Sequence, residues 1–298
     1  LIYLERLARR GRRYHHTSIR YRSLPGYPLR GWAAAASTAA CLAPLVLGFA
    51  VPGAVLLDYA LVHYGATLEA DYFIYTLNSL TLSTTAAVIA VALGTFMAYG
   101  LRLGGGPVFT AMTRFASLGY AVPGAVLAIG VIIPMAWFDN QVDAFMRATF
   151  GFSTGLLLSG TIAAVTFGYL VRFLALSFGT IEASLAKVTD NMDGAARTLG
   201  SGPADTLRRV HLPMMRGSVL TAGILVFVDG MKELPMTMIL RPFDFHTLAT
   251  FVHEYASDEL LAESSLAALT IVASGILPVI LLSYTITRSR PGHRQGGG

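Results

Sequence analysis

Residues 72–101 read YFIYTLNSLTLSTTAAVIAVALGTFMAYGL, a stretch without a single Asp, Glu, Lys or Arg. An α-helix needs roughly 20 apolar residues to cross a hydrocarbon layer about 30 Å thick, so this stretch is long enough to span a membrane. A sixth run, 217–240, is apolar on both sides of Asp229, Lys232 and Glu233, and we count it as a span as well. The other four runs are free of charge: 31–57, 115–138, 148–171 and 264–287.

The composition of the whole chain agrees with a membrane location. Of its 298 residues 54% are hydrophobic and 13% are charged, whereas a soluble domain carries about 25% charged residues. Backbone groups in lipid must hydrogen-bond within their own segment, and the sequence has no ten-residue alternating strands. We therefore predict an all-α polytopic membrane protein with six transmembrane helices. The single cysteine, Cys41, excludes a disulfide scaffold and a cysteine-rich metal site.

The distribution of charge predicts the orientation of the helices. If six spans alternate, 19 of the 22 lysines and arginines fall on the side of the two termini. The positive-inside rule then places both termini in the cytoplasm. This sorting argues for a lipid membrane, and against nucleic acid, as the partner of a chain with a net charge of +5.

A long loop at 179–216 lies on the predicted cytoplasmic side. Residues 181–199 are rich in helix formers and end at Gly200, which suits a helix C-cap. Pro203 then suits the first position of a second helix, after Ser201 and Gly202. The loop thus predicts a helix, a glycine turn and a second helix, which form either a docking surface for another protein or a connector between two spans.

Inside this loop residues 194–200 read GAARTLG, and VHLP follows at 210–213 after nine residues. This motif resembles the EAA loop of ABC importer permeases. That pattern is Glu-Ala-Ala, three residues, Gly, nine residues and Ile-x-Leu-Pro, and the spacing here is the same throughout. In the family, the loop forms a coupling helix that sits in a cleft of the ATP-binding subunit. The resemblance implies a type I importer permease (MetI-like) fold and a coupling role for 193–213. The implied coupling residues are Asp193, Gly194, Ala195, Ala196, Gly200, Val210, Leu212 and Pro213.

One position departs from the EAA pattern. The glutamate of the motif is Gly194 here, and Asp193 precedes it by one residue. A shift of one residue rotates a side chain by about 100° around a helix. Two alternatives follow: Asp193 replaces the acidic contact to the ATPase, or that contact is absent.

Other stretches are similar to the binding-protein-dependent ferric-iron permeases. These stretches are KELPMT at 232–237, LRPF at 240–243 and TLAT at 247–250, and YHHTS at 14–18 resembles the middle of the fused two-half forms. The resemblance implies import of ferric iron delivered by a periplasmic binding protein in the bacterial inner membrane. Thiamine, polyamine and sulfate permeases share this architecture and remain alternatives, as do an ion-coupled secondary transporter and a membrane anchor without a transport role.

The same resemblance suggests how the chain is organised. Residues 1–30 are a basic cytoplasmic lead or a linker between two halves, 31–287 form the six-helix permease domain, and 288–298 form a cytoplasmic tail. The implied partners are an ABC ATPase dimer, a second permease half, fused or separate, and the binding protein. Neither Lys187 nor Lys232 is followed by Ser or Thr, so a Walker A motif is absent from the sequence. We therefore expect a transport subunit that is not an enzyme and needs no cofactor, with ATP hydrolysis in a separate chain.

Two groups of polar residues are candidate transport sites. Asp229, Lys232 and Glu233 have the spacing i, i+3 and i+4, which predicts one shared helix face. Charge within a membrane faces the bundle interior or water, so this face indicates either a translocation path or gate, or a buried ion cluster between helices. His246 and His253 are two helical turns apart on the outer side and are weak candidates for contact with iron. The alternative for these histidines, which we favour, is a polar loop helix.

Overall fold

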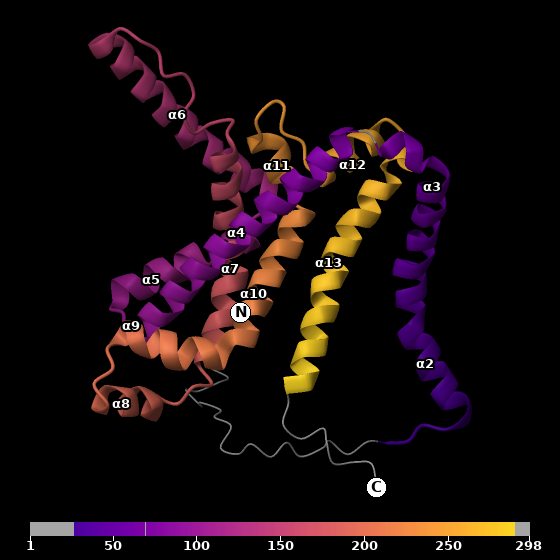
Figure 1. The fold of residues 1–298 in the computed structure, drawn as a ribbon, viewed down its shortest axis with the longest axis horizontal. Helices are drawn as coiled ribbons and strands as arrows, with labels where there is room; N and C mark the ends of the chain where they lie inside the picture. Colours follow the sequence, from indigo (N-terminus) through magenta and orange to yellow (C-terminus); the bar gives the residue numbers. More distant parts are fainter. Residues whose placement is uncertain (1–26, 69, 290–298) are drawn as a thin grey trace.

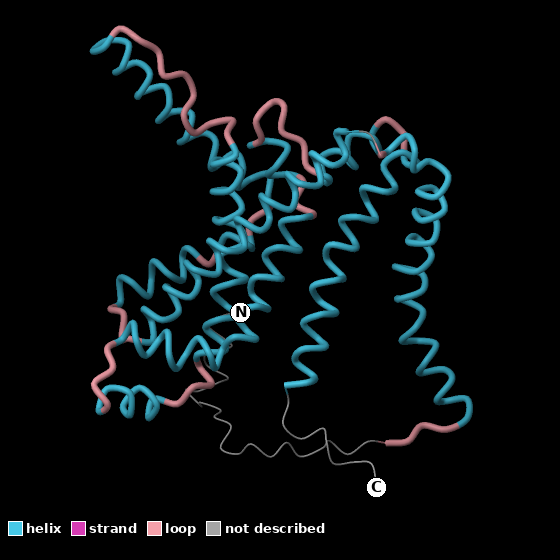
Figure 2. The backbone as a smooth tube through the Cα atoms, in the orientation of Figure 1, coloured by secondary structure: helices cyan, strands magenta, loops and turns pink. Residues whose placement is uncertain are grey.

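The computed structural model describes residues 27–68 and 70–289, and all regular structure in that part of the chain is helical (Figure 2). Most of the predicted lead at 1–30 and of the predicted tail at 288–298 lies outside the described residues. Six helices are long and apolar enough to cross a membrane, as predicted. They are Gly31–His63, Asp71–Arg102, Gly124–Phe150, Ile162–Leu185, Pro203–Met231 and Leu261–Tyr284.

The helical elements follow one another along the chain with short connections. The first half contains α2 (Gly31–Leu45), η1 (Val46–Ala50), α3 (Val51–Thr67), α4 (Ala70–Arg102), α5 (Pro107–Ala116), η2 (Gly119–Ala121) and α6 (Gly124–Phe150). The second half contains α7 (Ile162–Leu185), α8 (Asp190–Thr198), α9 (Pro203–Thr206), η3 (Leu207–His211), α10 (Leu212–Met231), α11 (Pro235–Leu240), α12 (Leu248–Ser257) and α13 (Leu261–Ser289).

The packed centre of the molecule is formed by α4, α7 and α10. Small residues allow α4 and α7 to approach closely: the hydroxyl of Ser177 donates to the carbonyl of Ala90 at 2.7 Å, beside Gly94. Small side chains are typical of helix contacts in membranes, where dispersion and hydrogen bonds replace the hydrophobic effect. Phe173 and Val226 complete the buried core between these helices.

The first span lies apart from this centre. The helices α2 and α3 run along one edge of the molecule, and α3 contacts α13 near the end that is remote from α8 (Figure 1). None of the residues of α2 is buried. Figure 1 also shows that α2 begins, and α13 ends, on the same side of the molecule as α8, as an even number of crossings requires.

The boundaries of the third span differ from the prediction. The run 115–138 does not form one helix, because α5 ends at Ala116 and α6 begins only at Gly124. Between them, Gly119 lies so close to the backbone of Val171 that an added Cβ would collide with the Val171 carbonyl. The third crossing therefore starts with a break beside the middle of α7, and α6 continues past the predicted end to Phe150.

The fourth span is displaced along the sequence from 148–171 to 162–185. Gly151, Gly155 and Gly160 adopt positive φ values, so the segment between α6 and α7 is not helical. The helix α7 begins where the hydroxyl of Thr161 accepts a hydrogen bond from the amide of Ala164 at 3.3 Å. As a result α7 contains Arg172 and Glu182. The sequence predicted both residues in the loop after the span 148–171, because that span is free of charge.

The far end of α6 projects beyond the bundle, together with the segment that returns to α7 (Figure 1). Asp143 fastens this segment to α6, because its carboxylate accepts from the hydroxyl of Ser153 at 2.6 Å and from the amide of Thr154 at 2.8 Å. Asp139 is fully buried and accepts from the amide of Ser159 at 2.8 Å. Both carboxylates therefore have a structural role.

The close contact between α4 and α7 predicts the effect of enlarging Gly94. A Cβ at Gly94 would lie 2.7 Å from Ser177 Oγ and 2.9 Å from the amide nitrogen of Phe178, so the helices must separate. We expect Gly94→Ala to destabilise the protein by about 1–3 kcal/mol, the usual cost of overpacking. The measurement is the midpoint of thermal unfolding in detergent. Gly130→Ala is the control, because a Cβ there meets no atom within 4 Å; equal midpoints for the two variants would contradict the packing argument.

Candidate functional site

The predicted helix–turn–helix exists, but its first helix is interrupted. Residues 181–199 do not form one helix, because α7 ends at Leu185 and α8 begins at Asp190. The guanidinium of Arg102 donates to the carbonyls of Leu185, at 2.8 Å, and of Val188, at 3.0 Å, and stabilises the break between the two helices. We call residues 190–211, from the start of α8 to the end of η3, the α8–η3 segment.

Gly200 forms the turn between α8 and α9, as the sequence predicted. Its φ of +84° is in the left-handed region, where a side chain costs roughly 1–2 kcal/mol. The amide of Ser201 then donates to the carbonyl of Ala196 at 3.0 Å, which closes a helix C-cap. Pro203 starts α9 as expected.

The candidate coupling residues divide into an outward and an inward set. Leu199, between Thr198 and the glycine turn, is 85% exposed and gives the segment an apolar tip. Gly194, Ala195, Gly200 and Pro213 are exposed, Val210 and Leu212 are half-buried, and Ala196 is buried. The segment therefore presents a small-residue surface with two large exposed apolar side chains, Leu199 and Met192, and this surface is accessible to another protein.

Asp193 belongs to the inward set. One carboxylate oxygen accepts from Nε of Arg102 at 2.9 Å, and the other lies 2.7 Å from Nε2 of His211. A carboxylate oxygen only accepts, so Nε2 of His211 carries the proton. In this structure the Asp193 carboxylate is held by residues of its own chain.

The sequence analysis missed Arg102 and the role of His211. His211 is fully buried, its ring packs against that of Tyr99 with centroids 5.5 Å apart, and its Nδ1 has no hydrogen-bond partner within the described part of the chain. Tyr99 also donates from its hydroxyl to the carbonyl of Pro203 at 2.8 Å. His211 lies in the π-helical turn η3, and such turns often occur at functional sites. This turn is visible only in the structure, so it could not point to His211 from the sequence.

The second candidate site is a break between α10 and α11. The helix α10 ends at Met231, because Pro235 cannot donate a backbone hydrogen bond and its ring would clash with the Met231 carbonyl in a continuous helix. The predicted shared face therefore holds for Asp229 and Lys232 but is wrong for Glu233. Lys232 pairs with Asp229 at 2.8 Å and has a side chain that is 62% exposed, whereas Glu233 is 7% exposed and faces another helix.

Glu233 pairs with Arg172 of α7, with 3.5 Å between Oε2 and Nε. The same carboxylate accepts from the amide of Met236 at 3.3 Å, in the first turn of α11. A Cβ at Gly124, the first residue of α6, would lie 2.7 Å from Glu233 Oε1 and would collide with the Arg172 guanidinium. Three helices thus meet at one buried ion pair, which the sequence analysis missed because it placed Arg172 in the loop.

Tyr169 satisfies the backbone at the break. Its buried hydroxyl lies 3.3 Å from the carbonyl oxygens of Gly230 and Glu233 and 2.7 Å from Oγ1 of Thr237. Non-helical backbone at membrane depth is stable only where other groups of the protein satisfy it. On the other side of the break, the hydroxyl of Tyr120 donates to Asp229 at 3.1 Å.

The two candidate histidines do not form a metal site in the described part of the chain. Nδ1 of His246 accepts from the Arg241 guanidinium at 2.7 Å, and Arg241 in turn pairs with Glu254 at 2.9 Å, so this nitrogen already has a protein partner. His253 is exposed. The described residues contain no group of three or more His, Cys, Asp or Glu side chains that could hold a metal ion.

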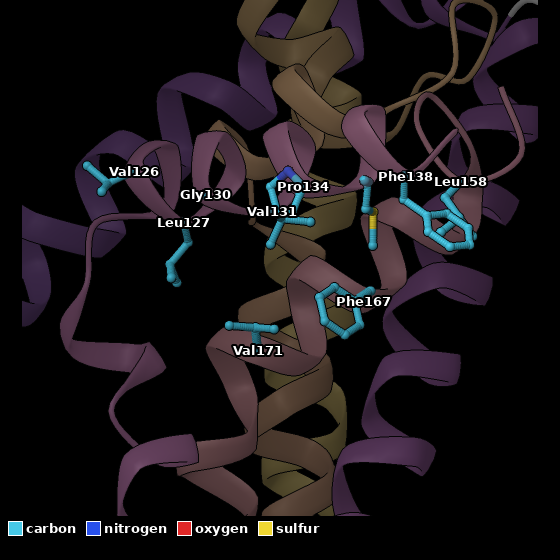
Figure 3. Close-up of a pocket in the computed structure, with 10 residues that line it drawn as sticks. Val126, Leu127, Gly130, Val131, Pro134, Phe138, Leu158, Phe167 and Val171 are labelled. Carbon is cyan, nitrogen blue, oxygen red and sulfur yellow. The ribbon is translucent and has the colours of Figure 1, made fainter. Parts of the chain in front are cut away.

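An apolar groove of about 670 Å³ lies between α6 and α7 (Figure 3). Val131 and Pro134 of α6 line it on one side, and Phe167 and Val171 of α7 on the other. The groove has no charged side chain in its wall. It therefore suits apolar contact and has no group that would bind a charged solute.

The fold is that of ABC transporter permeases. A chain of a bacterial alginate ABC transporter, solved in complex with an alginate pentasaccharide-bound periplasmic protein, is similar with a TM-score of 0.65 and 10% identity, over 89% of this chain and 96% of that chain. A chain of the MetNI methionine ABC transporter is similar with a TM-score of 0.50 and 13% identity, over 74% and 99%. The prediction of a MetI-like, all-helical permease fold is confirmed.

The sequence relatives are transport permeases with different solutes. The Fe(3+)-transport system permease protein FbpB 2 of Haemophilus influenzae is 30% identical over 169 residues, which are 57% of this chain but only 30% of that protein. PhnV of Salmonella typhimurium, named as a 2-aminoethylphosphonate transport system permease, is 25% identical over 79% of this chain and 82% of its own length. A comparison with protein-family models finds none that matches.

The glycine turn predicts a local effect of substitution at Gly200. A β-branched side chain at φ +84° is strained, so Gly200→Val should loosen the turn and expose the backbone after Arg197. We expect tryptic cleavage after Arg197 to be at least several times faster than in the unmodified protein. Gly194→Ala is the control, because Gly194 is helical and a Cβ there meets open space. Equal cleavage rates in both variants would show that the turn does not depend on its glycine.

The buried pair of Arg172 and Glu233 predicts a non-additive effect. Removal of one partner leaves an uncompensated buried charge, which costs about 3–5 kcal/mol. We expect Arg172→Met and Glu233→Gln each to lower the midpoint of thermal unfolding more than the double variant does. Additive losses in the double variant would mean that the two side chains do not act as a pair.

Proposed function

We propose that the chain is a transmembrane permease subunit, or one half of a fused permease, of an ATP-driven ABC importer in the bacterial inner membrane. The observation that carries this proposal is the α8–η3 segment, an accessible helix–turn–helix anchored on the helix bundle beyond the ends of α4 and α7. The permease fold and the permease relatives support the proposal. In this arrangement the α8–η3 segment and both termini face the cytoplasm.

The partners follow from the same arrangement. The outward surface of the α8–η3 segment, with Gly194, Ala195 and the exposed tip at Leu199, would dock to an ABC ATPase of a dimer that hydrolyses ATP. A second permease half would complete the pathway, and a periplasmic binding protein would deliver the solute to the opposite face. On that face Phe243 is fully exposed at the tip of the loop between α11 and α12, where it would meet such a protein.

The break between α10 and α11 would form part of the path or gate for the solute. Lys232 and Asp229 lie on its more exposed side, and Arg172 and Glu233 tie it to α7. When ATP binding moves the α8–η3 segment, α10 would move with it and change the position of the break relative to α6 and α7. The bundle would thus alternate between inward-open and outward-open states.

We propose ferric iron as the solute, because the ferric permease of Haemophilus influenzae is 30% identical over 169 residues of this chain. The 2-aminoethylphosphonate permease is a specific competitor, since its similarity extends over 79% of the chain. The test measures uptake of radiolabelled ferric iron by vesicles that contain the chain and the ATPase, with the binding protein added. Vesicles loaded with ATP are compared with vesicles without ATP. ATP-dependent uptake of labelled 2-aminoethylphosphonate instead would replace the solute but retain the importer. Uptake that is insensitive to ATP and abolished by a proton uncoupler would favour a secondary transporter.

The exposed ion pair at the break predicts a transport defect without loss of assembly. Lys232→Ala leaves Asp229 with Tyr120 as its remaining polar contact and changes the charge along the proposed path. We expect uptake to fall at least tenfold while the ATPase still co-purifies in the same ratio. Lys187→Ala is the matched control, because Lys187 is exposed on the connection between α7 and α8. Loss of co-purification in the Lys232 variant would assign that pair to stability of the fold.

A further inference from the structure

The α8–η3 segment carries ion pairs of two kinds, local and long-range, and Arg102 forms the long-range ones with Asp193 and, at 3.9 Å, with Asp190. Arg209 pairs with Asp205 one helical turn away at 2.6 Å, and both side chains are exposed to a large extent. Asp193, in contrast, pairs with Arg102, which lies 91 residues away in the sequence, and the Arg102 side chain is only 11% exposed. A local pair stabilises its own turn, whereas the second pair joins separate elements.

Arg102 connects three elements at once. It is the last residue of α4 and donates from Nε to Asp193 of α8. Its Nη1 and Nη2 donate to the carbonyls of Leu185, at the end of α7, and of Val188, in the connection to α8. A planar guanidinium with several fixed donors holds such an arrangement more rigidly than a single hydrogen bond would.

His211 connects the same carboxylate to α10. It is the last residue of the π-helical turn η3, and α10 begins at the next residue. Its ring has no freedom to rotate away, because it is fully buried and packs against Tyr99 of α4. One carboxylate on α8 is thus fixed to the ends of two core helices, α4 and α10.

Without these bonds the α8–η3 segment, together with the connection that precedes it, would have three soft points. They are the connection 186–189, the turn at Gly200 and the π-helical turn η3. A load applied to α8 would bend such a segment and would not reach the bundle. We propose that Asp193 is a positioning residue that locks α8 to α4 and α10, so that displacement of α8 turns these helices as one body. The role in transport rests on the proposed function, whereas the lock itself belongs to this chain alone.

The test measures the rigidity of the lock in the full chain in lipid nanodiscs. In a Cys41→Ser background, spin labels at Asn191→Cys on α8 and Leu220→Cys on α10 report their separation by pulsed electron resonance. We expect one narrow distance distribution, and Asp193→Ala should broaden it at least twofold. Asp205→Ala is the matched control, because it removes a carboxylate from the same segment without breaking a link to α4 or α10; it should leave the distribution narrow.

A second variant keeps the test decisive if Asp193→Ala does not fold. His211→Phe retains a ring against Tyr99 and removes only the donor to Asp193, so it should also broaden the distribution. A distribution as narrow as that of the unmodified chain, in whichever of these variants folds, would overturn the proposal.

A functional readout separates the lock from the proposed function. In the assembled complex, Asp193→Ala should raise the ATP hydrolysed per ferric ion transported at least fivefold, whereas a purely structural defect lowers both rates together and would overturn the role in transport. If the chain binds no ATPase, the proposed function fails, and the spin-label distances in the chain alone still decide whether the lock exists.

Discussion

Hydrocarbon offers no hydrogen bonds and little stabilisation of charge, so each backbone break and each ionised group inside this bundle needs a partner from the protein itself. The break after Met231 shows the consequence most clearly. Tyr169 and Thr237 lie against the carbonyls that the break frees, and Arg172 compensates the buried Glu233. Gly124 has no side chain and therefore leaves room for the Arg172–Glu233 pair, so α6 can begin close to that pair.

The same requirement shapes the opposite end of the bundle, where α4, α7 and α10 reach the α8–η3 segment. Arg102 takes up the carbonyls that α7 leaves free at its end and binds the carboxylate of Asp193. The segment that presents an accessible surface is therefore also bonded to the core helices through Asp193. An element that receives a mechanical load from a partner needs both properties together.

Several charged side chains of this chain stabilise loops, a role that their residue types do not reveal. Asp139 and Asp143 organise the segment between α6 and α7 through backbone amides and hydroxyl groups. Arg241 bonds to both His246 and Glu254, which lie 3.4 Å from each other, so these side chains form a polar cluster beside the loop before α12. In both places the charged side chains stabilise local structure, and one of them includes His246, a candidate for contact with iron from the sequence.

The sequence alone determined the number of spans, the helical class of the fold and the glycine turn at Gly200. Each of these depends on local properties, namely the length of an apolar run, the need of lipid-exposed backbone for internal bonding, and a backbone angle that favours glycine. Only the tertiary structure decided where α7 begins and which charges pair. Arg172 and Glu233, like Arg102 and Asp193, are far apart in the chain, and their pairing depends on which helix ends meet in the bundle. A stretch of sequence does not show which helix ends come together. A buried arginine and a loop arginine look the same in the sequence, and they differ in the partner that folding brings to them.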